Sequence, residues 1–137
     1  MRKSGWLAMS VIALCGLTLM ANEKPTEAYA NAMKAVNTAN MSLRGNVQAK
    51  NYEGIAKDAA SLKAAFTTVE QWWTAKKADD AITAAKAAVK GATDLEAAAN
   101  AKNDEGITAA QRAMAGTCMT CHMAHRERLA DGTFEIK

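Results

Sequence analysis

Four stretches of this chain repeat apolar residues at intervals of three and four, which is the spacing of one face of an α-helix. They cover residues 26–50, 52–76, 79–101 and 104–130. Only a few residues separate one stretch from the next, so consecutive helices must run in opposite directions. The pattern predicts an all-α protein that folds as an antiparallel up-down-up-down four-helix bundle.

The apolar stripe of each helix is expected to face the centre of the bundle. The stripes consist of Tyr29, Met33, Val36, Leu43 and Val47; Ile55, Ala59, Leu62, Phe66, Val69 and Trp73; Ile82, Ala85, Val89, Ala92 and Ala99; and Ile107, Ala110, Met114, Cys118, Cys121 and His125. Asn40 is the polar exception on the first stripe. In the third helix, Gly91 before Thr93 and Asp94 also fits a kink followed by a new helix start.

A short repeat relates the two halves of the chain. Residues 49–55 read AKNYEGI, and residues 101–107, at an offset of 52, read AKNDEGI. In each copy an asparagine can cap a new helix, and an acidic residue lies in its first turn. The simplest interpretation is a pair of similar helical hairpins. A high alanine content and a single proline, Pro25, agree with an all-helical fold.

The first 21 residues have the pattern of a secretory signal peptide. Charges at Arg2 and Lys3 precede an apolar run over residues 6–20, and cleavage is expected near Ala21. Residues 22–137 would then form one exported domain, periplasmic or the equivalent, with an uncleaved membrane anchor as the alternative. This domain has 15 Lys and Arg against 14 Asp and Glu, so no nucleic-acid partner is expected.

The chemistry of the chain is carried by Cys118-Met119-Thr120-Cys121-His122. Two thiols separated by two residues and followed at once by a histidine form the attachment motif of a c-type haem. On a helix, positions i and i+3 share a face, so both cysteines can bond one porphyrin while His122 reaches the iron as proximal ligand. One covalently attached haem c is therefore the expected cofactor.

Two other uses of the cysteine pair fit the sequence less well. A zinc site needs four ligands, usually in separated pairs, whereas His122 and His125 lie three residues apart and directly beside the cysteines. A thioredoxin-like redox motif needs a βαβ context, and no strand pattern flanks this motif. Haem attachment remains the favoured interpretation.

The repeat also predicts which residues lie level with the haem. If the first two helices turn near residue 51, Met33 lies level with Val69, and the offset of 52 puts Val69 level with Cys121. Met33 is therefore the candidate sixth iron ligand, with ordinary core packing as the alternative. Met41 lies eight residues further along, about 12 Å at the helical rise, and off the stripe.

Other residues are expected to complete the pocket. Phe66, Trp72 and Trp73 lie at the haem end of the second helix and are expected beside the pocket, where one or both tryptophans would exclude water. The alternative is a bulky end of the bundle with no electronic role. Arg126 follows His122 by four residues and could pair with a haem propionate. His125 is expected to be packed or half-exposed, because it cannot easily reach the same iron.

An exported four-helix chain with Cys118, Cys121 and His122 in its last helix, followed by Arg126, resembles the cytochrome c prime family. The early Met33-Lys34 is similar to the methionine-ligated, low-spin branch of that family and to the soluble four-helix b-type cytochrome. The C-terminal residues 125–137 are similar to those of a group of small bacterial c-type cytochromes. Two positions depart from the family: an arginine common in the first helix is absent, and His125 replaces a usual aromatic residue.

The resemblance implies a periplasmic haem protein of one of two functional classes. With Met33 as sixth ligand, the protein would carry single electrons between redox partner proteins. With a five-coordinate iron, Val36 would crowd the sixth position and the protein would bind nitric oxide or carbon monoxide. No catalytic acid, base or nucleophile beyond the iron is identified, so an enzyme is not expected. A homodimer, frequent in the family, is left open.

Overall fold

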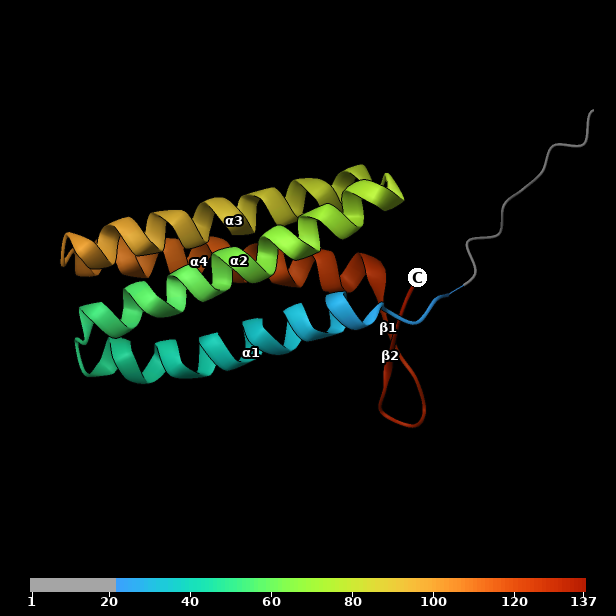
Figure 1. The fold of residues 1–137 in the computed structure, drawn as a ribbon, viewed down its shortest axis with the longest axis horizontal. Coiled ribbons are helices and arrows are strands. Elements are labelled where there is room, and N and C mark those ends of the chain that lie inside the picture. Colours follow the sequence, from blue (N-terminus) through green and yellow to red (C-terminus); the bar gives the residue numbers. More distant parts are fainter. Residues whose placement is uncertain (1–21) are drawn as a thin grey trace, which may run out of the picture.

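The computed structural model describes residues 22–137 (Figure 1). The elements are α1 (Glu27–Gln48), α2 (Tyr52–Lys76), α3 (Asp79–Asn100) and α4 (Asp104–His125), followed by the short strands β1 (Arg126–Arg128) and β2 (Phe134–Ile136). The predicted antiparallel four-helix bundle is confirmed. The expected signal peptide, residues 1–21, lies outside the described part. None of the helices in residues 22–137 has the length and apolarity needed to cross a membrane.

The two copies of the repeat form the same turn. Asn51 accepts a hydrogen bond from the backbone N–H of Gly54 at 3.1 Å, and Asn103 accepts one from Gly106 at 3.0 Å. The lysine before each asparagine is left-handed, with φ of 51° and 54°. These side chains satisfy amide groups that the first turn of a helix leaves without partners. The repeat therefore sets where α2 and α4 begin.

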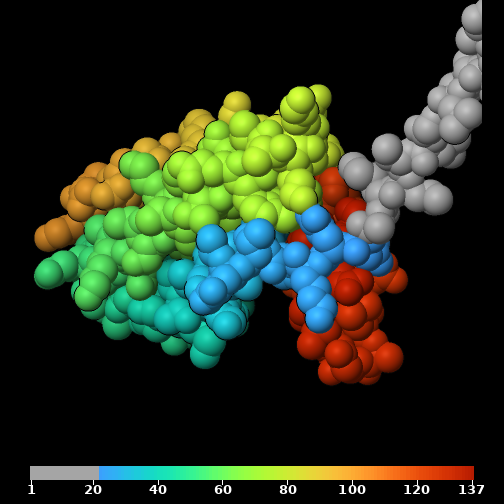
Figure 2. All heavy atoms as spheres, turned by 45° about the vertical axis from the view of Figure 1, so that its right-hand side comes forward, coloured from blue at the N-terminus to red at the C-terminus, as the bar shows by residue number. Residues whose placement is uncertain are grey.

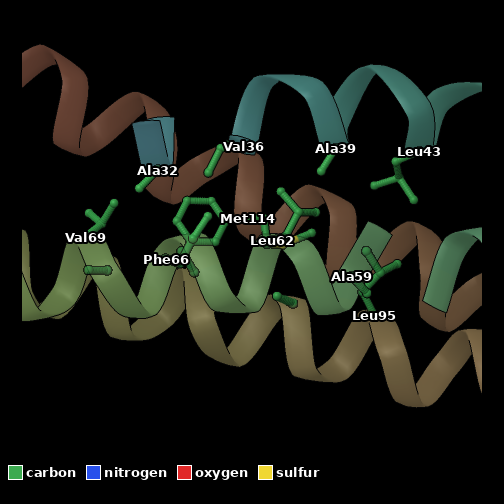
Figure 3. Packing of buried hydrophobic residues seen from close by; sticks show 14 of the residues in the cluster. Ala32, Val36, Ala39, Leu43, Ala59, Leu62, Phe66, Val69, Leu95 and Met114 are labelled. Atoms are coloured by element: carbon green, nitrogen blue, oxygen red, sulfur yellow. The ribbon is translucent and has the colours of Figure 1, made fainter. Parts of the chain in front are cut away.

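The core follows the predicted stripes closely in α2 and less closely in α3. Every stripe residue of α2 is buried, and Figure 3 shows members of this stripe facing those of α1. In α3, Ala81, Ala88 and Leu95 are buried, whereas the larger Ile82 and Val89 are only half-buried. Small residues thus occupy much of the interior face of α3, which lets neighbouring helices approach closely.

Gly91 lies within the continuous helix α3 and marks no kink. A Cβ atom at this position would lie 2.5 Å from Cγ of Met114, which belongs to α4. The glycine is therefore explained by the close approach of two helices.

The fourth helix ends earlier than predicted. Residues 104–130 were expected to be helical, but α4 ends at His125, and Arg126 is already extended. β1 pairs antiparallel with β2, and Gly132, with φ of 85°, lies in the turn between them. Helix formers in residues 126–130 favoured a helix locally, but the hairpin buries Ile136, which is 9% exposed.

The N-terminal segment joins this hairpin. Glu23 and Ile136 exchange two backbone hydrogen bonds, of 2.9 and 2.8 Å. Figure 2 shows the start of the described chain, in blue, lying against the C-terminal hairpin, in red. Both ends of the described chain therefore meet at one end of the bundle.

The helices do not close into a complete ring. α1 packs on α2, α2 on α3, and α3 on α4, whereas α1 and α4 stay largely apart. Helices in a bundle normally bury their apolar stripes against both neighbours. The gap between α1 and α4 is therefore the place to look for a site.

Candidate functional site

A cleft of about 720 Å³ lies between α1 and α4 and is closed at one end by the C-terminal hairpin. Its volume falls within the range of about 300–1,000 Å³ that is usual for small-molecule and cofactor sites. The lining includes Tyr29, Met33, Val36, Cys118, Cys121 and His122. The cysteine motif and the predicted sixth ligand therefore line one cavity.

A second cavity, of about 430 Å³, adjoins the first toward the middle of the bundle. The two share Asn37, Asn40, Cys118 and His122 as lining residues. Phe66 lines this second cavity, beside α4. Cys118 and His122 thus stand at the junction of the two cavities.

Helical spacing explains why the motif presents both thiols to the cleft. Cys118 and Cys121 are separated by three positions on α4, so they share a face, and both are half-buried free thiols. Burial raises the pKa of both thiols, that of Cys121 to about 11, where Asp80 and Cys118 add to the effect. Both therefore remain protonated at neutral pH in the unmodified protein.

The imidazole of His122 is half-buried beside the two thiols. Burial, helped by the nearby Arg126, lowers the pKa of His122. A lowered pKa favours the neutral ring, and only the neutral ring offers a nitrogen lone pair to a metal. The environment of His122 is therefore suited to a ligand role.

Direct contacts confirm the register that the repeat predicts. The ring centroids of Tyr29 and Trp73 are 6.1 Å apart, and those of Trp73 and His125 are 4.7 Å apart. These three residues thus lie level on α1, α2 and α4. One helical turn further into the bundle come Met33 and Cys121, which line the same cleft.

His125 is half-buried, as expected, and is held in place from two sides. Its Nε2 lies 2.8 Å from Oδ2 of Asp80, at the start of α3, and its ring packs on Trp73. This contact lowers the pKa of Asp80, because the carboxylate gains a hydrogen-bond donor. The pair links α4 to α3 beside the cleft.

The residues expected to wall the pocket have different positions. Phe66 lines the second cavity and a small crevice of about 20 Å³ between α2, α3 and α4. Trp73 is 3% exposed and lies behind Tyr29 and His125, which themselves line the cleft. Arg126 lines the cleft at the hairpin end, with its guanidinium carbon 3.6 Å from the ring centroid of Phe134.

The charges around the two cavities have one sign. Apart from the histidines, the charged residues that line them are Lys34, Arg44 and Arg126, and no carboxylate within residues 22–137 lines either cavity. The carboxylate of Asp80 does not line the cleft but is bound to His125, which does. The cleft is therefore apolar with a cationic border, which suits a flat, apolar group with acidic substituents.

Sequence reasoning missed several of the lining residues. Asn37, Asn40 and Arg44 follow Met33 at intervals of three or four, so their spacing placed them on one face of the first helix. Asn40 was noted only as a polar exception, and Tyr29 only as a core residue. The polarity of Asn37, Asn40 and Arg44, on a helix face that also carries Met33, was the signal that could have identified these lining residues.

Comparisons with protein-family models, with curated proteins and with solved structures give no significant match. Within the described range, the side chains of His, Cys, Asp and Glu form no cluster of three or more that could hold a metal ion. The function must therefore be argued from the cleft and the residues that line it.

Proposed function

We propose that this protein is an exported monohaem c-type cytochrome that carries single electrons. Cys118 and Cys121 would hold the porphyrin by thioether bonds, and His122 would be the proximal iron ligand. The haem would supply one-electron chemistry, because its iron alternates between the ferrous and ferric states. The observation that carries the proposal is the cleft between α1 and α4, which all three motif residues line.

The chain fits such a group in shape, polarity and charge. The cleft is deep and mostly apolar, and Val36 and Ile136 contribute aliphatic lining. The cationic residues Lys34, Arg44 and Arg126 would complement the two propionates of a haem. Partial exclusion of water by the hairpin would favour the less charged ferrous state and raise the reduction potential.

Met33 is the proposed sixth ligand. It lies on α1, across the cleft from Cys121 and His122, and it is half-buried. Met41 is 67% exposed and lines neither cavity, whereas Met119, which borders the second cavity, is 63% exposed and shares α4 with His122. A thioether ligand would leave no open site for gases and would support electron transfer with redox partner proteins.

The first test is expression in a bacterial host that attaches c-type haem in its periplasm. The purified protein is expected to gain the mass of one haem and to keep its colour after denaturation. Its ferric spectrum should be low-spin, with a sulfur-to-iron charge-transfer band. The double variant Cys118→Ala/Cys121→Ala is the control, and it should lose the covalent pigment while keeping the helical fold. Export in the same host with loss of residues 1–21 would support the predicted signal peptide.

Wild-type protein that is folded and exported but carries no covalent haem would refute the proposal. A matched control, His122→Ala, separates attachment from ligation. It should weaken or abolish the low-spin spectrum even where the thioether bonds still form, because the proximal nitrogen is lost.

The gas-binding alternative is tested at the sixth position. Met33→Ala should convert the iron from low-spin to high-spin and allow carbon monoxide to bind, because it removes the proposed thioether ligand. Met41→Ala, a matched change on the exposed face of α1, should leave the spectrum unchanged. A high-spin wild-type spectrum that shifts with carbon monoxide would instead favour a five-coordinate protein that binds nitric oxide or carbon monoxide.

A further inference from the structure

An aromatic cluster closes the cleft at the hairpin end. It consists of Tyr29, Trp72, Trp73 and His125, and successive ring centroids are 4.6 to 4.7 Å apart from Tyr29 through both tryptophans to His125. Tyr29 and His125 line the cleft, whereas Trp73 lies behind them. Each ring of the cluster contacts at least two neighbouring side chains.

Trp73 has an unexplained polar atom in this cluster. The residue is 3% exposed, and its indole Nε1 is the one buried side-chain nitrogen or oxygen in residues 22–137 without a hydrogen-bond partner. A buried donor without a partner is costly and needs a reason. The Trp73 N–H lies near the Tyr29 hydroxyl and offsets part of the rise in the pKa of Tyr29. The two groups do not form a hydrogen bond of good geometry.

The Tyr29 hydroxyl is the polar group that connects this donor to the cleft. Burial raises the pKa of Tyr29 to about 12, so the hydroxyl keeps its proton and acts as a hydrogen-bond donor. Cys121 and Arg126 are both near enough to influence the same hydroxyl. The guanidinium of Arg126 is held over Phe134 at 3.6 Å. The neutral donor of Tyr29 and the cation of Arg126 therefore both lie at the hairpin end of the cleft, whose lining within residues 22–137 has no carboxylate.

We propose that the hairpin end of the cleft binds one carboxylate of the haem, with the Tyr29 hydroxyl as donor and Arg126 as counter-charge. Trp73 is a positioning residue, because its N–H, which has no partner, would donate to the Tyr29 oxygen once the Tyr29 proton is given to the ligand. This inference rests on the proposed function. It adds an uncharged hydrogen-bond donor beside the cation of Arg126 at this end of the cleft.

The strength of such a contact sets the size of the expected effect. A hydrogen bond to a charged group is about twice as strong as one between neutral groups, so losing it should weaken binding about 10-fold to 100-fold. The Trp73 N–H would polarise the Tyr29 hydroxyl and strengthen this bond by a smaller factor. Trp72, half-buried beside Lys76, has no place in this chain of donors.

The test uses the full chain with the Cys118→Ala/Cys121→Ala changes, so that haem binds reversibly. Two probes are titrated: haem with free propionates, and haem dimethyl ester, in which both carboxylates are blocked. Tyr29→Phe should weaken binding of free haem about 10-fold or more and leave binding of the ester within about 2-fold. Trp73→Phe should have a smaller effect on free haem. Tyr52→Phe, the same change at the opposite end of the bundle, is the matched control and should have none.

The role of Trp73 has its own measurement. If Trp73 acts through Tyr29, Trp73→Phe should lose its effect on haem affinity once Tyr29 is already phenylalanine. Equal weakening of both probes by Tyr29→Phe, or no weakening of either, would overturn the carboxylate site. An undiminished effect of Trp73→Phe in the Tyr29→Phe background would overturn the positioning role.

A second readout comes from the covalently loaded protein, where loss of affinity cannot hide the result. The propionate bending vibrations in the resonance Raman spectrum should shift in Tyr29→Phe and stay unchanged in Tyr52→Phe, at the opposite end of the bundle. No shift in Tyr29→Phe would contradict the inference while leaving the cytochrome proposal intact. A wild-type protein that takes up haem in neither form would instead refute the proposed function itself.

Discussion

The α2–α3 and α1–α4 seams both join one helical hairpin to the other, yet one is closed and the other is open. At the closed seam, Ala81, Ala85 and Ala88 are buried and let the helices approach, leaving a crevice of about 20 Å³. At the open seam lies a cleft of about 720 Å³. The same bundle therefore has one seam that stabilises the fold and one that is available for a ligand.

The turns do not cause this difference. Both turns of the repeat have the same conformation, and they are linked by the Lys50–Asp104 ion pair of 2.8 Å and by a Tyr52–Asp104 hydrogen bond of 2.9 Å. At the other end of the bundle, the ring of Tyr29 and the C-terminal hairpin line the cleft. The open seam is therefore marked by the residues that line it rather than by the turns of the repeat.

The largest expected effect comes from adding volume to the closed region. Ala92 is completely buried in α3, and Ala92→Leu should destabilise the fold by about 3 kcal/mol, because a packed core cannot accept the extra carbons without strain. Ala30 lines the open cleft, so Ala30→Leu should cost less than about 0.5 kcal/mol. Urea denaturation of both variants without haem checks the pair. Similar losses would mean that the α1–α4 seam is not open in solution.

The second prediction concerns alkaline pH and the open seam. The pKa of Tyr29 is raised to about 12, mainly by burial, whereas an unfolded tyrosine titrates near 10. A raised pKa means that the contribution to stability is complete below about pH 10 and is lost as pH rises toward 12. By pH 11 about 1.4 kcal/mol should be gone.

Tyr29→Phe removes this contribution and should make stability less sensitive to pH above 10. The thiols of Cys118 and Cys121 also have raised pKa values, but they are present in both proteins and cancel in the comparison. The check is urea denaturation at pH 9 and pH 11 without haem. Tyr52→Phe, at the half-buried first residue of α2, should change the pH dependence less. An identical pH dependence in Tyr29→Phe and wild type would contradict the burial of this hydroxyl.

Much of the fold could be predicted because its determinants are local. Apolar spacing predicted the bounds of the four helices to within a few residues, except at the end of α4. The 52-residue repeat predicted the register between helices, and the contacts of Trp73 with Tyr29 and His125 confirm it. The positions of Cys118 and Cys121 on one helical face also follow from spacing alone.

The hairpin and the location of the cleft could not be predicted, because both depend on contacts between distant segments. Residues 126–130 favour a helix locally, but β1 pairs with β2 instead, and Ile136 of β2 also pairs with Glu23. Small residues on a helix can either leave room for a cofactor or let helices pack closely, and spacing alone does not distinguish the two. In the structure Ala81 and Ala85 pack closely against their neighbours, and the space lies between α1 and α4.

The smallest expected effect tests how firmly the open seam is held. Asp80 bonds His125 at 2.8 Å, but its own side chain is 68% exposed, so Asp80→Asn should change the stability only slightly. The same change at Asp94, which pairs with Lys90 within α3, should cost no more than about 0.5 kcal/mol. The distinguishing measurement is near-ultraviolet circular dichroism of the tryptophans. Asp80→Asn should alter it by freeing the ring stacked on Trp73, and Asp94→Asn should not. An unchanged signal in Asp80→Asn would mean that packing on Trp73 alone fixes His125, and that this end of the cleft stays ordered without the link to α3.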